Sequence, residues 1–370
     1  MAEVTREDIL NVLDGISDPA RGQSIVALGM IAGIQIKDGH VAFGIEVDPA
    51  QAKAMEPVRA EAEKRVHALP GVLTVTAVLT AEKQAAQPSH GGQQQGQRVP
   101  PLELPGIGAV IAVASGKGGV GKSTTAVNLA LALAASGKSV GLLDADVYGP
   151  SIPRMLGITG KPQMAEDKKV IPMERHGIKC MSMGFLIDEE TPIIWRGPMA
   201  TGALEQLMRD VAWGQLDVLV VDMPPGTGDI HLSMAQRAPL TGAVIVSTPQ
   251  DIALLDARKG LNMFRKVEVP VFGLIENMSY FVCPHCGERT EIFSHGGAKR
   301  EAERLGMDFL GEIPLDIAIR ETSDGGEPIV VSDPDSPHSQ AYRTIAARVW
   351  EKIGESQSQQ AAGAPRIVMQ

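Results

Sequence analysis

A run of glycines with two lysines and a hydroxyl residue has the spacing of a phosphate-binding loop. Residues 116–123 read Gly-Lys-Gly-Gly-Val-Gly-Lys-Ser and satisfy the pattern G-x-x-x-x-G-K-S/T, between an apolar run and a helical segment. Such glycines let backbone N–H groups converge on phosphate oxygens, and the helix N-terminus adds positive potential. Lys122 would reach the β- and γ-phosphates, and Ser123 would coordinate Mg²⁺. The predicted nucleotide contacts are Gly116, Lys117, Gly118, Gly119, Val120, Gly121, Lys122, Ser123 and Thr124.

Two acidic residues that follow apolar runs are candidates for the same site. Asp146 stands just beyond the run 140–144, and Asp222 ends the run 218–222 in a Walker B pattern that would hold Mg²⁺ through water. A strand-end aspartate alone is often only a cap. Beside a phosphate loop it gains meaning, because ligands of parallel sheets bind at the carboxyl ends of the strands. The following segment 224–229 reads as a loop that could sense the γ-phosphate.

A third candidate is the C-x-x-C pair of Cys283 and Cys286, two of the three cysteines in the chain. A thioredoxin-like redox pair is disfavoured, because the motif lies far from any first βα unit. A zinc site would need further ligands, for which His285 and His295 are available. Alternatively, two chains could each give two thiolates to one iron–sulfur cluster. The residues favour iron–sulfur over zinc and leave zinc open. Cys180 reads as a core cysteine.

The composition limits the classes of protein that the chain can represent. Its 370 residues are 44% hydrophobic and 21% charged, which excludes wholesale disorder. The net charge of −10 argues against nucleic acid or an anionic membrane as a partner. The longest apolar stretch, 126–143, contains Asn128 and Lys138 and fails as a membrane span. With no secretory signal at its start and no disulfide framework, we expect a reduced, cytoplasmic protein.

Patterning divides the chain into four parts. Residues 1–82 alternate helical and strand periodicity in the order α-β-β-α-β, which predicts a small α+β domain. Residues 83–104 are rich in Gln, Gly and Pro and predict a flexible linker. Residues 105–354 form the phosphate-binding domain, and residues 355–370 read as a disordered tail.

Short apolar runs alternate with helical segments across the third part. Runs of this kind, nearly continuous in Val, Ile and Leu, belong to strands that are buried on both faces of a parallel sheet. We therefore predict a doubly wound, mostly parallel α/β domain. The predicted strands are 109–114, 140–144, 218–222, 243–247 and 271–276.

The segment SGKGGVGKST resembles the deviant Walker A loop of the MinD/ParA and nitrogenase iron-protein group. In that group the extra lysine crosses a dimer interface to the partner's nucleotide. The resemblance therefore implies a homodimer in which Lys117 acts in trans, although a solvated loop lysine is the simpler interpretation of the residue alone. It also implies that Asp146 positions or deprotonates the attacking water.

Six segments in order, from SGKGGVGKST to IFSHGG, resemble the Mrp/ApbC family of P-loop ATPases, which are scaffolds and carriers for iron–sulfur clusters. The resemblance implies slow ATP hydrolysis and a [4Fe-4S] cluster bridged by Cys283 and Cys286 of two protomers. It implies cluster-assembly proteins as donors and apo iron–sulfur proteins as recipients, and it matches Asn277 to an asparagine that recognises adenine. Asn277 could equally cap a turn.

The first 80 residues are similar to the small assembly domain that precedes the ATPase in many bacterial members. A cysteine often follows the hairpin there, but residues 47–50 read Val-Asp-Pro-Ala, so we assign this domain no cluster chemistry. Two alternatives remain. One is a positioning ATPase of the MinD or ParA kind, disfavoured by the net charge and by a tail without a basic amphipathic helix. The other is a zinc-bearing, nucleotide-dependent scaffold.

Overall fold

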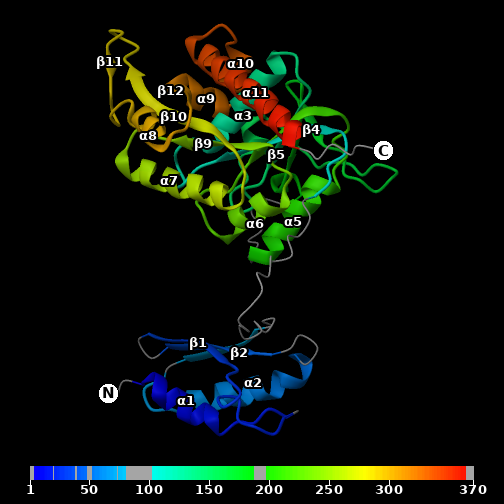
Figure 1. Ribbon diagram of the computed structural model, residues 1–370, viewed down its shortest axis with the longest axis vertical. Coiled ribbons are helices and arrows are strands. Elements are labelled where there is room, and N and C mark those ends of the chain that lie inside the picture. The colour runs from blue at the N-terminus through cyan, green and yellow to red at the C-terminus, as the bar shows by residue number, and fades with distance from the viewer. Residues whose placement is uncertain are drawn as a thin grey trace. The chain divides into compact units, whose positions relative to one another are not determined.

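The computed structural model contains two compact units, Met1–Gln95 and Gly96–Gln370 (Figure 1). It describes residues 4–19, 21–37, 40–47, 52–72, 74–80, 102–186 and 197–363. Apart from residues 102–104, the linker predicted for residues 83–104 lies outside the described residues.

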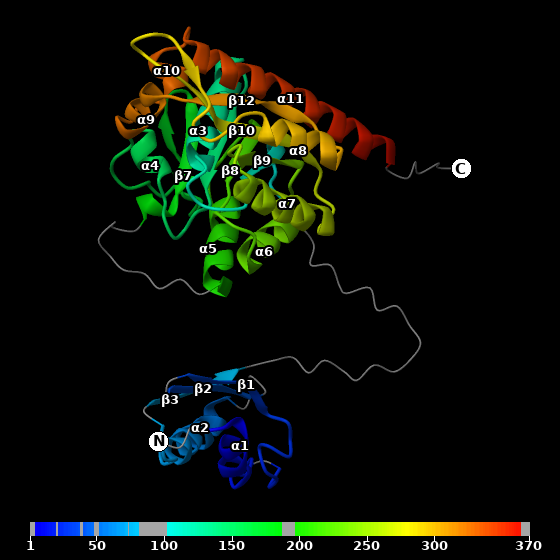
Figure 2. The same ribbon diagram turned by 90° about the vertical axis from the view of Figure 1, so that its left-hand side faces the viewer.

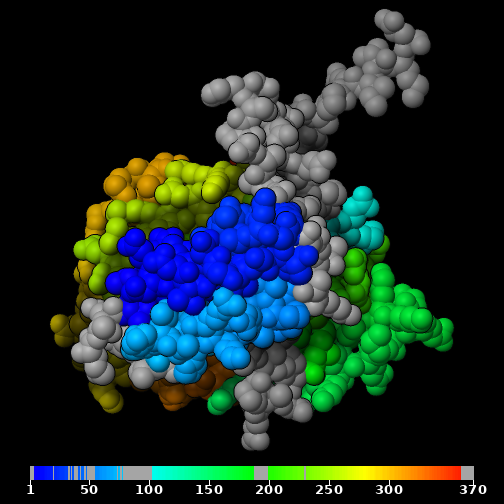
Figure 3. Space-filling view, turned by 90° about the horizontal axis from the view of Figure 1, so that it is seen from below, coloured from blue at the N-terminus to red at the C-terminus, as the bar shows by residue number. Residues whose placement is uncertain are grey.

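The small unit has the predicted α-β-β-α-β order. Its elements are α1 (Arg6–Asp14), β1 (Ile31–Lys37), β2 (His40–Glu46), α2 (Ala52–His67) and β3 (Thr74–Thr80). Strand β2 lies between β1, to which it is antiparallel, and β3, to which it is parallel. The side chain of Thr5 caps α1 by accepting a hydrogen bond from Asp8 N. Helices α1 and α2 lie side by side (Figure 3), and Ile9 and Leu13 are buried in the same core as Phe43.

The large unit is built on a nine-stranded sheet in the order β11-β10-β9-β4-β8-β5-β7-β6, with β12 paired to β10. The strands are β4 (Ile107–Ala114), β5 (Val140–Asp144), β6 (Met173–Arg175), β7 (Ile178–Ser182), β8 (Leu216–Asp222), β9 (Gly242–Ser247), β10 (Val271–Val282), β11 (Arg289–Thr290) and β12 (Phe309–Leu315). All neighbouring strands are parallel except the pairs β6–β7 and β10–β11.

Helices cover both faces of this sheet. They are α3 (Lys122–Ala135), α4 (Ile152–Met155), α5 (Gly197–Arg209), α6 (Asp229–Arg237), α7 (Asp251–Lys266), α8 (Gly297–Leu305), α9 (Ile317–Asp324), α10 (Ile329–Ser332) and α11 (Pro337–Gly363). Figures 1 and 2 show α3 and α11 on one side of the sheet and α5, α6 and α7 on the other. The doubly wound α/β fold predicted from the apolar runs is therefore confirmed. Among the described residues, none of the helices combines the length and apolar character that a bilayer span needs.

The C-terminal helix corrects one prediction. Residues 355–363, expected to be disordered, continue α11. Two of their polar side chains bond to backbone carbonyls. Ser356 Oγ donates to Thr241 O, just before β9, at 3.1 Å, and Gln357 Nε2 donates to Gly108 O of β4 at 2.9 Å. Residues 364–370 of the predicted tail lie outside the described residues.

Strand β10 corrects another. The apolar run ends at Glu276, but the strand continues to Val282, so Asn277 lies inside it rather than beyond its end. The extension is polar on the side where β10 meets β12 and β11, and polar side chains there bond to each other instead of filling an apolar core.

Candidate functional site

The predicted phosphate loop connects β4 to α3 in a tightly enclosed place. A Cβ atom on Gly116 would lie 2.2 Å from the backbone carbon of Asp256 in α7, so the loop approaches that helix closely only without a side chain. Gly121 has φ +78°, and a Cβ there would meet Asn277 Nδ2 at 2.1 Å. The loop shape therefore depends on glycine at both positions.

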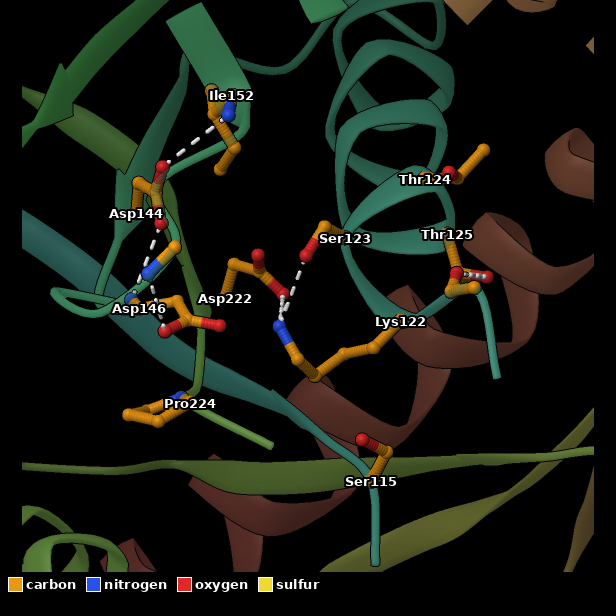
Figure 4. Close-up of polar contacts among 12 residues, drawn as sticks. Ser115, Lys122, Ser123, Thr124, Thr125, Asp144, Asp146, Ile152, Asp222 and Pro224 are labelled. Carbon is orange, nitrogen blue, oxygen red and sulfur yellow. Dashed lines mark hydrogen bonds and ion pairs between the residues drawn. The ribbon is translucent and has the colours of Figure 1, made fainter. Parts of the chain in front are cut away.

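Lys122 and Asp222 form a buried ion pair at the start of α3. Lys122 Nζ donates to Asp222 Oδ1 at 2.5 Å and to Ser123 Oγ at 3.0 Å, and the two side chains of the pair are 6% and 0% exposed (Figure 4). Burial raises the pKa of Asp222, and the Lys122 ammonium opposes that rise. The structure thus brings together two of the predicted residues and pairs the Lys122 ammonium with the Asp222 carboxylate.

The oxygen atoms around this pair suit Mg²⁺. Among the described residues, Asp222 Oδ2 is buried and has no hydrogen-bond partner, and the Ser123 hydroxyl lies beside Lys122. Mg²⁺ prefers oxygen ligands and keeps several waters, so an unpaired carboxylate oxygen next to a hydroxyl fits the ion. The donor set is therefore consistent with the predicted magnesium ligands.

Asp144, for which the sequence analysis predicted no role, positions the turn that carries Asp146. The Asp144 carboxylate is 1% exposed and accepts hydrogen bonds from Ile152 N at 3.2 Å, Ser182 Oγ at 3.0 Å and Asp146 N at 3.2 Å (Figure 4). Burial, and then the charge of Asp222, raises the pKa of Asp144 to about 7. Asp146 itself is half-buried and lines the cavity next to the phosphate loop.

The predicted γ-phosphate loop is held by His231 of α6, a residue that the sequence analysis missed. His231 is 3% exposed, burial lowers its pKa, and its Nε2 lies 2.5 Å from Pro224 O. A neutral imidazole at that position must donate its Nε2–H to the carbonyl. Gly226 N also donates to Ser115 O at 3.1 Å, which ties this loop to the end of β4.

The phosphate loop and Asp146 line a cavity of about 620 Å³. One side consists of the phosphate loop with Asp146, Pro225 and Asn277, and the other of residues from α4, β12 and α9. The second wall includes Arg154, Met155, Pro314, Leu315, Asp316, Ile319 and Arg320. A cleft of this size can hold a nucleotide. The wall from α9 was not predicted from the sequence.

Asn277 bonds to the phosphate loop itself. Its Nδ2 donates to Val120 O at 2.8 Å, and the residue is 7% exposed. Its predicted contact with adenine stays a prediction, as does the action of Lys117 across a dimer. Lys117 is half-buried and lines the same cavity.

Cys283 and Cys286 lie on the turn between β10 and β11, at one edge of the sheet. Cys283 N donates to Glu288 O at 2.9 Å, and Gly287 N donates to Cys283 O at 2.8 Å, so the turn is closed by backbone bonds. The Cys283 thiol is half-exposed and the Cys286 thiol is exposed. Backbone N–H groups of Cys286 and His285 lower the pKa of Cys283, which favours the thiolate that a metal binds.

Of the other candidates for metal binding, His285 is exposed on the cysteine turn, His295 is engaged elsewhere and Cys180 is buried. His295 Nδ1 lies 2.9 Å from Ser279 Oγ, and Arg289 Nη2 lies 3.1 Å from both ring nitrogens, so His295 is not free to complete a zinc site with the cysteines. Cys180 is fully buried in β7, where burial raises its pKa, as expected of a core cysteine.

Two family models match the chain. Residues 106–350 match the model described as NUBPL iron-transfer P-loop NTPase, and residues 6–78 match the model described as iron-sulfur cluster assembly protein. The first match covers the phosphate loop with Asp144, Asp146 and Asp222, which we call the nucleotide edge, and also the cysteine turn. The second match covers most of the small unit.

Individual proteins agree with these models. The chain is 57% identical over 267 residues to the iron-sulfur cluster transfer protein NUBPL of Dictyostelium discoideum, covering 71% of this chain and 83% of that one. It is 44% identical over 355 residues to an iron-sulfur cluster carrier protein of Synechocystis, covering 95% and 98%. Among solved structures, the nucleotide-binding protein of Archaeoglobus fulgidus in complex with ADP has a TM-score of 0.57 at 41% identity and covers 65% of this chain and 93% of that one.

Proposed function

The chain belongs to the NUBPL iron-transfer P-loop NTPase family, and from this membership we propose that it is an ATP-hydrolysing carrier that binds an iron–sulfur cluster and passes it to apoproteins. The single observation that carries the proposal is the course of β10. The middle of this strand contributes Asn277 to the nucleotide cavity, and its C-terminal end leads directly into the turn that carries the half-exposed Cys283 and the exposed Cys286. A positioning ATPase needs the first feature and gives no reason for the second.

The buried charges suggest how the nucleotide would react. Lys122 would leave Asp222 for the β- and γ-phosphates, and the freed Asp222 with Ser123 would hold Mg²⁺. The bound ion neutralises charge that develops on the phosphate oxygens. Asp146, oriented through its backbone bond to Asp144, would position the attacking water or accept its proton. Lys117 of a second protomer would add a positive charge beside the negatively charged γ-phosphate.

The cysteine turn suggests how the cluster would be held. One chain offers two thiols there, and a [4Fe-4S] cluster takes four thiolates. Two chains that face each other would supply all four, with the cluster as cargo between them. The lowered pKa of Cys283 favours rapid capture, and the exposure of Cys286 leaves the cargo accessible to a recipient.

The expected partners follow from the cargo. Cluster-assembly proteins would load the carrier, and apo iron–sulfur proteins would unload it. The small unit, which resembles iron-sulfur cluster assembly proteins, is the candidate for contact with one of these groups. Exposed free thiols must stay reduced to function, so we place this exchange in a reducing compartment such as the cytoplasm.

A transfer experiment tests the proposal. The chain is reconstituted anaerobically with iron and sulfide, freed of excess reagent, and mixed with an apo dehydratase whose activity requires a [4Fe-4S] cluster. We expect the dehydratase to regain activity while the visible absorption of the carrier falls. A protein that hydrolyses ATP but retains no iron would instead be a positioning ATPase, and one that retains zinc without sulfide would be a scaffold.

A further inference from the structure

Strand β10 connects the nucleotide cavity to the cysteine turn without an intervening loop. Asn277 and Cys283 are six positions apart, which corresponds to about 20 Å along an extended chain. A displacement at one end of such a short segment reaches the other end unless neighbouring strands absorb it.

The nucleotide end of this segment is in direct contact with the phosphate loop. Asn277 Nδ2 donates to Val120 O at 2.8 Å, and its position leaves no room for a Cβ on Gly121. A phosphate group that rearranges the backbone at Val120 and Gly121 must therefore shift Asn277 or break its bond. This makes Asn277 a sensor of loop conformation as well as a wall of the cavity.

The middle of the segment is irregular. Met278 has φ +57°, a left-handed conformation that is uncommon for a residue with a side chain. The pairing with β12 shifts register between Asn277 and Phe281. The regular ladder of backbone bonds is interrupted there, so the position of the strand depends on its side chains.

Those side chains form a polar hub, which we define as the buried Glu276 and Ser279 and the partly exposed His295 and Glu312. Ser279 Oγ lies 2.6 Å from Glu276 Oε1, 2.9 Å from His295 Nδ1 and 3.2 Å from Glu312 Oε2. Glu276 is 0% exposed and also accepts hydrogen bonds from Gly296 N at 2.9 Å and Ala298 N at 2.7 Å. The hub thereby fixes β10 to β12 and to the start of α8.

The hub is better explained as a hydrogen-bond network than as a cation site. His295 and the two glutamates could offer metal ligands, since their ligand atoms all lie within 4.8 Å of one another. However, the Ser279 oxygen already lies within hydrogen-bond distance of all three, and the Arg289 guanidinium, 3.1 Å from both nitrogens of His295, adds a positive charge. A metal ion would have to displace both.

Arg289 extends the hub to the cysteine turn. It lies on β11, where its backbone pairs with Val282, the residue before Cys283. Its guanidinium stacks on the Tyr280 ring at 3.8 Å while it contacts His295. Both strands that carry the turn are therefore held by the same set of side chains.

We propose that β10 is a mechanical link through which nucleotide in the cavity changes the reactivity of the Cys283 and Cys286 thiols, with Ser279 and His295 as its positioning residues. The link rests on the proposed function, because it gives the means by which ATP would control the hold on the cluster. Asn277 detects the loop at one end, and the hub converts its movement into a movement of the turn.

Alkylation of the metal-free chain tests the link without any cluster. The rates at Cys283 and Cys286 with iodoacetamide are measured by mass spectrometry, with no nucleotide, with Mg-ADP and with a non-hydrolysable ATP analogue. Cys180, which is 0% exposed, reports unfolding if it becomes labelled. We expect the analogue to change the rate at one or both exposed thiols by about fivefold or more, within the usual range of coupling between two sites.

The variants locate the link. Ser279→Ala, outside the cavity, and Asn277→Ala, at nucleotide concentrations that saturate that variant, should each bring the rate ratio close to one. His295→Asn, which keeps a polar atom near Nδ1, should retain more of the ratio than His295→Ala. Gln357→Ala is the matched control, because it loses the same kind of amide-to-carbonyl bond at Gly108, away from β10, and should keep the full ratio.

The outcomes separate the link from the proposed function. A ratio of one in the unaltered chain, or a full ratio in both Ser279→Ala and Asn277→Ala, overturns the link even if the chain carries a cluster. A ratio that follows only the oligomeric mass, measured in parallel by light scattering, overturns it as well. Failure to retain iron and sulfide overturns the proposed function and leaves the alkylation result standing.

Discussion

The nucleotide edge and the cysteine turn are joined by the second half of β10, from Asn277 to Val282, but they differ in burial. At the nucleotide edge, Lys122, Asp144 and Asp222 are at most 6% exposed and bond to each other or to backbone atoms. At the turn, Cys283 is half-exposed, Cys286 is exposed, and backbone hydrogen bonds close the loop. The ion pair at the nucleotide edge forms within one chain, whereas the turn offers two thiols, fewer than the four thiolates that a [4Fe-4S] cluster takes.

This difference indicates what each region needs from outside. Buried charges are costly unless paired, so on the proposed function Lys122 would exchange Asp222 for the phosphates of a nucleotide. Exposed thiols carry no comparable desolvation cost and remain accessible to a metal. We therefore expect the buried nucleotide edge to control the carrier and the exposed cysteine turn to hold the cluster.

The largest expected effect is that of Lys122→Ala. The variant should lose hydrolysis and bind ATP about tenfold more weakly or worse, because charge-assisted contacts contribute about 1.5–3 kcal/mol each. It also leaves the Asp222 carboxylate buried without its cation, which costs about 3–5 kcal/mol of the free energy of unfolding. Calorimetry and urea denaturation measure the two effects.

Lys352→Ala is the control for that experiment. Lys352 Nζ lies 2.7 Å from Asp308 Oδ2, but the Asp308 side chain is 59% exposed, so the loss should be about 1 kcal/mol or less. Equal losses in the two variants would show that burial does not distinguish the nucleotide edge.

The second effect concerns the cargo region. Cys283→Ser should abolish retention of iron and sulfide, because two hydroxyls replace two of four thiolates in a symmetric dimer. Its ATP affinity should hardly change, since the turn is outside the nucleotide cavity. Cys180→Ala, at the buried cysteine, should retain iron. An equal loss of iron in both variants would refute the assignment of the cluster to the turn.

A mixing experiment tests whether the nucleotide edge is complete in one chain. Lys117→Ala and Asp146→Ala should each lose hydrolysis as homodimers. In a dimer of the two variants, one site combines Lys117 of one chain with Asp146 of the other, and that site should regain activity. If hetero-dimers form without any recovery, Lys117 acts within its own chain or has no role.

The last prediction is a pH dependence of stability at Asp144. Because burial raises its pKa from 3.8 to about 7, the folded chain holds a proton that the unfolded chain releases over this interval. The contribution of Asp144 to the free energy of unfolding therefore falls as pH rises from about 4 to about 7. Asp144→Asn cannot titrate, so urea denaturation should show it gaining stability relative to the unaltered chain from about pH 4 to about pH 7. A constant difference would mean that Asp144 is ionised throughout.

The sequence predicted the nucleotide edge far better than the connections between its parts. The phosphate loop, Asp222 and the buried strands are local patterns, and each lies where its pattern predicted. The hub was missed because Ser279 and His295 are 16 positions apart, and a contact at that separation leaves no periodic signal. The sequence offered His295 only as a zinc ligand.

The end of α11 was mispredicted for a related reason. A segment rich in Ser, Gln and Ala lacks the apolar periodicity of a packed helix, and composition alone favoured disorder. Its anchors, Ser356 and Gln357, bond to carbonyls 115 and 249 positions away, which no local pattern reveals. Asn277 shows the same limit, since its nearest partner, Val120, is 157 positions distant.

The central claim is that the exposed region is half a site, and stoichiometry tests it most directly. The chain is reconstituted anaerobically, and iron, acid-labile sulfide and native mass are measured on the same sample. The account predicts a dimer with about two iron atoms and about two sulfides per chain, which is one [4Fe-4S] cluster for every two copies. Four iron atoms per chain on a monomer, or tightly held zinc with no sulfide, would contradict it.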